Sequence, residues 1–226
     1  MGDYQNIIEM IALTMGVGWA SGVNLYAAVL MLGYMGMTGN IDLPPGLEIV
    51  ENPLVMLGAG LMYVIEFFAD KTPGVDTAWD TLHTFIRIPA GAIMAMGAVG
   101  DTSSASELAA ALVGGGLATA SHAAKAGTRV MINTSPEPFS NWAASITEDV
   151  GVIAGLWTAL NHPVLFLVLL ALFILLLIWL LPRLWRAIKY VFRKLARLFG
   201  GGEDATPPPG FQGAGSGGKP PAPPPD

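Results

Sequence analysis

The stretch EFFADKTPGVDTAWDTLHTFIRIPAG, residues 66–91, decides how this chain folds. It holds four carboxylates, a lysine, a histidine and an arginine, although only 12% of the chain is charged. On a helix that begins near residue 76, four of these residues follow one another at spacings of four, three and four, so they share one helical face. They are Asp76, Asp80, His83 and Arg87. Such a stripe needs a polar surface opposite it, which the rest of the chain must supply.

Apolar residues make up 53% of the 226 residues and come in long runs, which is typical of a protein that folds in lipid. The least ambiguous run covers residues 163–181, nineteen residues without a charge, and is long enough to cross a bilayer. The chain has no cysteine, which excludes a disulfide framework and a Cys/His zinc site. The sequence therefore predicts an all-α polytopic membrane bundle.

Six segments are predicted to cross the membrane. The predicted third span contains Pro89 and Gly91, so it either crosses fully or forms a re-entrant element that lines a cavity. The first span is rich in glycine and alanine, which let a neighbouring helix approach closely. Asn24 lies among these small residues, where it either forms an interhelical hydrogen bond or lines a ligand position. The six spans are residues 7–34, 53–68, 76–99, 107–131, 142–160 and 163–181.

A second polar stripe lies in the fourth span, where His122, Lys125 and Arg129 recur at spacings of three and four. We expect it to face the stripe formed by Asp80, His83 and Arg87, because neither can stay unpaired in hydrocarbon. Six acids and four bases are expected within or beside the membrane, which leaves room for a bound cation or proton. These residues form the candidate site, either as an ion or ligand path or as a structural polar cluster. Its members are Asn24, Glu66, Asp70, Asp76, Asp80, His83, Arg87, His122, Lys125, Arg129, Glu148 and Asp149.

The distribution of charge predicts three regions and an orientation. Residues 1–182 form the transmembrane domain, and residues 183–199 form a basic amphipathic helix that carries six of the eleven Lys and Arg residues and binds anionic lipid head groups. Residues 200–226 contain eight Gly and eight Pro and are expected to be disordered. The acidic connection at residues 36–52 is expected outside the cytoplasm, and both termini inside it.

A weak internal repeat is visible in the two spans that are richest in glycine. Trp19-Ala20-Ser21 and Thr119-Ala120-Ser121 both follow glycine clusters and precede small residues. Two halves of three helices each would have opposite orientations in the membrane. Two inverted three-helix halves are thus one arrangement that the sequence allows, although small-residue helices also resemble one another by composition alone.

Three motifs resemble a bacterial membrane family known as domain of unknown function 4126. They are ASGVNLYA at residues 20–27, EFFADKTPGVDTAWDTLHTFIRIPAGA at residues 66–92 and TASHAAKAGTR at residues 119–129. The resemblance covers most of residues 10–160 and implies a multi-pass protein of the bacterial inner membrane. It brings no catalytic residue and no substrate, and the basic helix and the tail lie outside it.

The two stripes favour a small transporter or channel for an ion or a small polar solute, with cation or proton coupling as one form of it. An assembly or scaffold protein, held together by an intramembrane salt-bridge network, remains an alternative. A membrane-embedded metal-dependent hydrolase using Asp76, Asp80 and His83 is less favoured, because no paired nucleophile and base is recognisable. The pattern assigns no catalytic residue, metal site, cofactor or nucleic-acid partner. It leaves a homo-oligomer open.

Overall fold

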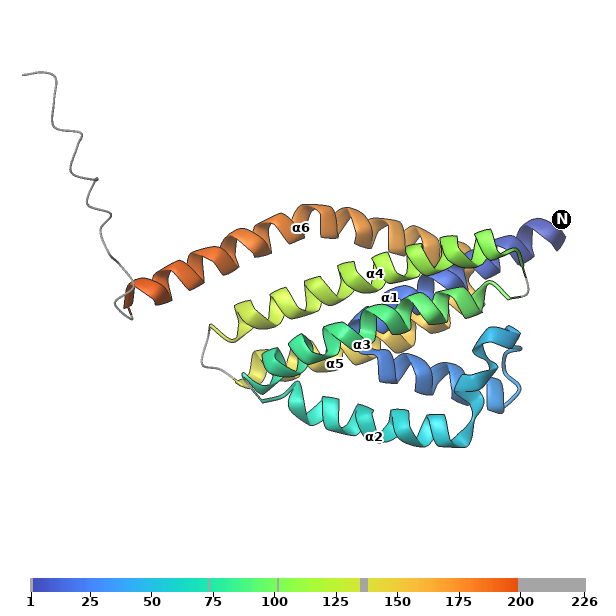
Figure 1. Ribbon diagram of the computed structural model, residues 1–226, viewed down its shortest axis with the longest axis horizontal. Coiled ribbons are helices and arrows are strands. Elements are labelled where there is room, and N and C mark those ends of the chain that lie inside the picture. Colours follow the sequence, from blue (N-terminus) through green and yellow to red (C-terminus); the bar gives the residue numbers. More distant parts are fainter. Residues whose placement is uncertain (1, 73, 101, 135–137, 199–226) are drawn as a thin grey trace, which may run out of the picture. The chain divides into compact units, whose positions relative to one another are not determined.

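The computed structural model describes residues 2–72, 74–100, 102–134 and 138–198, which form a bundle of helices (Figure 1). No strand occurs in these ranges, so the all-α prediction is confirmed. The chain divides into two units at residue 188, and of the second unit the structure describes residues 189–198. The helices are α1 (Gly2–Met37), the short 3-10 helix η1 (Pro45–Glu51), α2 (Pro53–Ala69), α3 (Val75–Ala98), α4 (Ser104–Ile132), α5 (Pro138–Asn161) and α6 (Pro163–Leu198).

The helix α1 is broken at Asn24, whose backbone angles (φ −147°, ψ 97°) are extended rather than helical. The side-chain Oδ1 of Asn24 accepts a hydrogen bond of 3.0 Å from the backbone N–H of Ala27. Asparagine is a favoured helix N-cap because its side chain can satisfy an N–H of the first turn in this way. Asn24 therefore ends one arm of α1 and begins another.

The two arms run in opposite directions. The N-terminal arm runs parallel to α4, because Gly18 faces Gly114 and Gly22 faces Ala118. The C-terminal arm runs antiparallel to α2, because Leu30 lies against Gly60 and the later Gly33 lies against the earlier Met56. The helices α2 and α4 run in the same direction, since Lys125 pairs with Glu66 and Arg129 with Asp70. Figure 1 shows the dark blue arm entering the bundle from the N-terminus and the lighter blue arm leading back toward η1.

This hairpin places the N-terminus beside the connection that follows α1. Asn6 and Glu9 line the same pocket as Asn40 and Asp42, so both ends of α1 lie at one end of the bundle. The prediction that the N-terminus and the acidic connection lie on opposite sides is therefore wrong. Its physical reason is the break at Asn24, which turns the first predicted span back on itself.

Length and composition identify few helices that could cross a membrane. Among the described residues, Asp3–Met37 and Pro163–Tyr190 are long and apolar enough, and a third span results if η1 and α2, bent by 66°, are counted together. Six spans are thus not confirmed. Large apolar side chains nevertheless cover the outside of the bundle, with Leu57, Phe85 and Leu112 each more than 60% exposed. Apolar outer faces together with these helices indicate association with a membrane.

The N-terminal arm of α1 packs closely against α4. A Cβ atom on Gly18 would lie 2.6 Å from the Cα atom of Gly114, and Ser121 Oγ donates to the Trp19 carbonyl at 2.9 Å. These parallel helices contradict the prediction of two inverted halves, which requires them to be antiparallel. The small residues that suggested a repeat are the two sides of one interface.

The helix α6 is continuous from Pro163 to Leu198, with Pro182 inside it. The last predicted span and the predicted basic helix are therefore parts of one helix, although a proline removes one backbone donor. Beside it, the Arg183 guanidinium donates to the Trp179 carbonyl at 2.6 Å. The predicted tail at residues 200–226 lies outside the described residues.

Candidate functional site

Charged side chains from four helices form one buried ion-pair network. Six of them are at most 3% exposed, and the seventh, Glu148, is 16% exposed. One acid lies in the last turn of α2 and a second caps the end of that helix, and the other members come from α3, α4 and α5. The members are Glu66, Asp70, Asp80, Arg87, Lys125, Arg129 and Glu148.

Lys125 lies at the centre of the network. Its Nζ is 2.8 Å from Asp70 Oδ2, 3.0 Å from Glu66 Oε1, 3.4 Å from Glu148 Oε2 and 3.8 Å from Asp80 Oδ1. An ammonium group has three N–H donors, so four carboxylates cannot all receive a direct hydrogen bond from it. The carboxylate farthest from Lys125 is that of Asp80.

Two arginines lie on either side of Lys125. Arg87 Nη1 is 3.2 Å from Asp80 Oδ1, and Arg87 Nη2 donates to Glu66 Oε1. Arg129 Nη2 is 2.7 Å from Glu148 Oε2 and 3.4 Å from Asp70 Oδ2. Each of these cations thus contacts carboxylates of at least two residues. Such pairing offsets the hydration that a charged group loses when it is buried.

The two predicted stripes meet in this network, and both histidines have defined partners. His122 Nδ1 lies 3.3 Å from Arg87 Nη1, which can only donate, so Nδ1 accepts and the proton sits on Nε2. That Nε2 is 3.1 Å from the Asp80 carbonyl. His83 Nδ1 lies 2.9 Å from the Trp79 carbonyl and therefore carries a proton. Its Nε2 lies 3.0 Å from the Tyr26 hydroxyl, which can donate or accept, so the contacts assign the neutral form to His122 alone.

The break in α1 is tied to the edge of the network through Asp149. Asn24 Nδ2 donates to Asp149 Oδ1 at 2.8 Å, and the Tyr63 hydroxyl donates to Asp149 Oδ2 at 3.0 Å. Asn24 thus forms an interhelical hydrogen bond, which was one of its two predicted roles. Asp149 joins α5 to both α1 and α2.

Asp76 lies apart from the network, although it shares a helical face with Asp80. Its Oδ1 accepts from the backbone N–H groups of Gly74 at 2.9 Å and Thr77 at 2.6 Å. Asn133 Nδ2 donates to both of its oxygens, at 2.8 and 3.0 Å. Asp76 therefore holds the first turn of α3 and fastens it to the end of α4.

Lys71, in the connection between α2 and α3, is buried beside aromatic rings. Its Nζ lies 2.8 Å from the centre of the Phe67 ring and donates to Ser145 Oγ at 3.4 Å. Burial lowers the pKa of Lys71, because the charged ammonium loses its hydration. This lysine fastens the end of α2 to α5.

Sequence reasoning missed several polar partners of the site. Tyr26, Tyr63 and Thr84 contact His83, Asp149 and His122, respectively. Each lies in an apolar or mixed segment where its hydroxyl gave no spacing signal. Asn141, in the first turn of α5, donates to Asn133 Oδ1 at the end of α4 at 2.9 Å.

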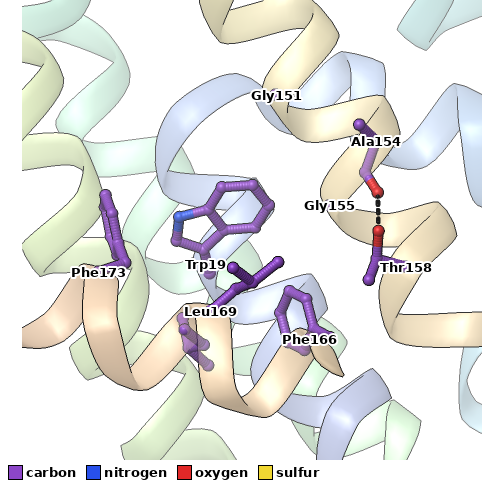
Figure 2. A pocket seen from close by; sticks show the side chains of 9 residues that line it. Trp19, Gly151, Ala154, Gly155, Thr158, Phe166, Leu169 and Phe173 are labelled. Carbon is purple, nitrogen blue, oxygen red and sulfur yellow. Dashed lines mark hydrogen bonds between the residues drawn. The ribbon is translucent and has the colours of Figure 1, made fainter. Parts of the chain in front are cut away.

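The pockets of 290, 390, 580 and 840 Å³ between described residues are lined by side chains outside the ion-pair network. Figure 2 shows the smallest of them, where Trp19 of α1 lies among Phe166 and Phe173 of α6 and Gly155 of α5. Its lining is almost wholly apolar. Trp19 forms edge-to-face contacts with both phenylalanines, at 6.2 and 6.1 Å between ring centres, and so anchors the N-terminal arm of α1.

In the part of the chain that the structure describes, no three His, Cys, Asp or Glu side chains are grouped so that they could hold a metal ion. The three residues of the hydrolase alternative have separate partners: Asp76 binds Asn133, Asp80 binds Arg87 and His83 binds Tyr26. The geometry therefore gives that alternative no support.

Comparison with known proteins places the chain in a family without an assigned activity. No curated protein and no solved structure matches it. The model of one family, described as Domain of unknown function (DUF4126), matches residues 11–183, which include α2 to α5 and the whole ion-pair network. The chain therefore belongs to the DUF4126 family.

Proposed function

We propose that this chain is a multi-pass transport protein of the bacterial inner membrane, which carries an ion or a small polar solute with cation or proton coupling. The observation that carries the proposal is the break of α1 at Asn24, inside the bundle and next to the ion-pair network. Broken helices of this kind form binding sites in many transporters, because the ends of their arms leave backbone groups free to contact a solute.

The depth of the break supports this proposal. Asn24 contacts Asp149, and Tyr26 contacts His83. Asp149 lies about 16 Å along α5 from its first residue, and His83 about 12 Å along α3, at ~1.5 Å per residue. The tip of the α1 hairpin thus lies well inside the bundle, and its two partners, Asp149 and His83, lie next to network residues of the same helices, Glu148 and Arg87.

The topology proposed for the membrane follows from the hairpin. The helices α2 to α6 cross, whereas α1 enters and returns on the side opposite to the basic part of α6. The positive-inside rule then places that basic part, and the C-terminus, in the cytoplasm. Non-helical backbone at membrane depth is tolerated where protein covers it, which is the situation of Asn24, only 2% exposed.

Flux measurements in reconstituted vesicles test the proposal. Proton, monovalent cation and small polar solute flux are measured for the wild type, for Asp80→Asn and for the control Asp42→Asn. Asp42 is an exposed acid at the far end of the bundle. Wild type and control should carry the same flux, and Asp80→Asn should carry none while it purifies as a folded protein. A wild type that carries none of the three overturns the transport function.

A second candidate is an assembly or scaffold protein in which the network is a structural clasp. It is favoured by one observation: all three cations of the network are buried and contact at least two carboxylates each. In that case no wild-type flux exists, and removal of a network charge lowers thermal stability alone.

We also propose that the basic part of α6 binds anionic lipid head groups. Arg183, Arg186 and Arg193 are exposed, whereas Leu184 and Ile188 are half-buried, so the segment has a basic and an apolar side. Each cation near an anionic surface contributes about 1 kcal/mol. In mixed bilayers, replacing Arg183 and Arg186 with Gln should weaken the binding of anionic lipid to the inserted protein and leave the binding of zwitterionic lipid unchanged, which quenching of tryptophan fluorescence by brominated lipids measures. Equal binding to both lipids by the wild type would contradict this proposal.

A further inference from the structure

The ion-pair network carries one more carboxylate than it has cations. Its acids are Glu66, Asp70, Asp80 and Glu148, and its bases are Arg87, Lys125 and Arg129. The neighbouring His122 is neutral, because its Nδ1 accepts from Arg87. If all four acids were ionised, one buried negative charge would have no counterion. A buried charge without a counterion is costly, and the usual response of such a group is to take up a proton.

Three carboxylate oxygens of the network are buried and have no hydrogen-bond partner in the protein. They are Glu66 Oε2, Asp70 Oδ1 and Asp80 Oδ2. Unpartnered acceptors of this kind are rare in folded proteins, and each needs an explanation such as a bound proton, ion or water. The excess of one carboxylate and the unpartnered oxygens are independent observations, and both are explained if a carboxyl group of the network binds a proton.

The distances single out Asp80 among the three acids. Asp70 has Lys125 at 2.8 Å, and Glu66 has Lys125 at 3.0 Å and Arg87 in closer contact. The two cations nearest to Asp80 are at 3.2 Å (Arg87) and 3.8 Å (Lys125). Asp80 is thus the least compensated acid, although its side chain is only 1% exposed.

The charged groups around Asp80 come from every helix that contributes to the network. On α3 itself Arg87 is its partner. The helix α4 provides Lys125, and the neutral His122 faces the Asp80 carbonyl rather than its carboxylate. The other acids that share its cations are Glu66 of α2, Asp70 at the C-cap of α2 and Glu148 of α5. These acids add negative charge around Asp80 and favour its neutral form.

We propose that Asp80 is a proton-binding site, at which a single exchangeable proton resides on the buried carboxyl group. The inference deepens the proposed transport function, on which its biological role rests, by naming the proton as the coupled ion. Release of this proton leaves the network with its excess negative charge. Opening the network to water, or admitting a cation, would then favour release.

Infrared spectroscopy of the purified protein in detergent tests the site without any flux measurement. The C=O stretch of a protonated carboxyl group is measured at neutral pH in the wild type, in Asp80→Asn and in the control Asp76→Asn. Asp76 is a suitable control because its Oδ1 and Oδ2 both accept hydrogen bonds. The wild type and Asp76→Asn should show a buried protonated-carboxyl band that Asp80→Asn lacks. A wild type without the band, or a band that survives in Asp80→Asn, overturns the proposal.

Stability provides a second readout, because Asn resembles a protonated Asp in shape and charge. Asp80→Asn should therefore unfold at the same temperature as the wild type at neutral pH, whereas Glu66→Gln should unfold at a lower one. If Asp80 is instead ionised and hydrated by water, Asp80→Asn will be the less stable protein or will fail to fold, and the proposal is wrong. Flux without the band would refute the proton site alone, and the band without flux would refute the transport function alone.

Discussion

Asn24, at the break of α1, donates a hydrogen bond of 2.8 Å to Asp149 in α5, a residue 125 positions later in the chain. The same side chain accepts from the N–H of Ala27 and so caps the second arm of α1. The break contains neither proline nor glycine at its centre. It is held by these two contacts, which makes Asn24 the residue on which the re-entrant shape of α1 most depends.

Replacing Asn24 with Ala should destabilise the protein by about 3 kcal/mol. Loss of the cap costs about 1 kcal/mol, and loss of a hydrogen bond to a carboxylate costs a further ~1.5–3 kcal/mol. Denaturant unfolding in detergent micelles measures the difference. The matched control is Asn40→Ala, because the Asn40 side chain is exposed and donates to Thr38. The control should lie within about 0.5 kcal/mol of the wild type. Equal stabilities for the two variants would contradict the role of Asn24.

Cysteine labelling should place the N-terminus and the α1–η1 connection on the same side of the membrane. The chain has no cysteine, so single substitutions can be labelled without background. Gln5→Cys and Asp42→Cys lie at one end of the bundle and Thr134→Cys at the other, and all three positions are exposed. A membrane-impermeant maleimide should label the first two from one side and the third from the opposite side. Labelling of Gln5→Cys together with Thr134→Cys would show that α1 crosses.

The spacing of charges could be predicted from the sequence because it depends on local helix geometry. Asp80 and Arg87 on α3, like Lys125 and Arg129 on α4, lie on one face of a helix whatever surrounds it. Burying either stripe alone would leave charged side chains unpaired, which is costly in a membrane. The contact between the two stripes could therefore be predicted as well. The sequence therefore located most of the network.

The break at Asn24 could not be predicted, because it depends on contacts that lie far away in the sequence. An asparagine in an apolar segment can form an interhelical hydrogen bond from an unbroken helix as readily as from a broken one, so its presence does not predict a break. Asp76 shows the same limit, since helical spacing groups it with Asp80. Its partner Asn133, together with its place in the first turn of α3, gives it a different role.

Introducing a large side chain at Gly114 should disrupt the packing of α1, α3 and α4. A Cβ atom there would contact the Cβ atom of Ala95 and would lie 2.8 Å from the Gly91 carbonyl oxygen. Gly114→Leu should therefore lower the free energy of unfolding by at least the ~1–3 kcal/mol that is typical of an overpacked core. Thermal unfolding in detergent measures this cost.

Gly116 provides the control for that prediction, because it lies on the same helix and, apart from the adjoining backbone and residues of α4, no described atom would lie within 4 Å of an added Cβ atom. Gly116→Leu should be neutral or slightly stabilising, since leucine has a higher helix propensity than glycine. A similar loss of stability at both positions would contradict the prediction, because it would show that the close approach of α1 and α3 to Gly114 does not determine the effect.

Removing Arg87 should destabilise the protein more than removing Arg87 and its partner together. Arg87→Met leaves Glu66 and Asp80 in a buried site with one cation fewer, and breaking a buried pair in this way costs about 3–5 kcal/mol. In the double variant with Glu66→Met, one cation and one acid are lost together, and apolar side chains take their places. The double variant should therefore regain part of the lost stability, which denaturant unfolding of the four proteins in a double-mutant cycle measures.

The same double variant separates the two candidate functions. The variant keeps Asp80 and Lys125, and it loses one positive and one negative charge together. If the network is only a structural clasp, the two methionines can pack in its place, and the protein should stay stable with unchanged assembly. In a transport protein the aqueous or proton path would lose two of its polar groups, so flux should fall even though the fold persists. A stable double variant with undiminished flux would exclude Arg87 and Glu66 from the path. Additive losses of stability would show that the two residues are not energetically coupled.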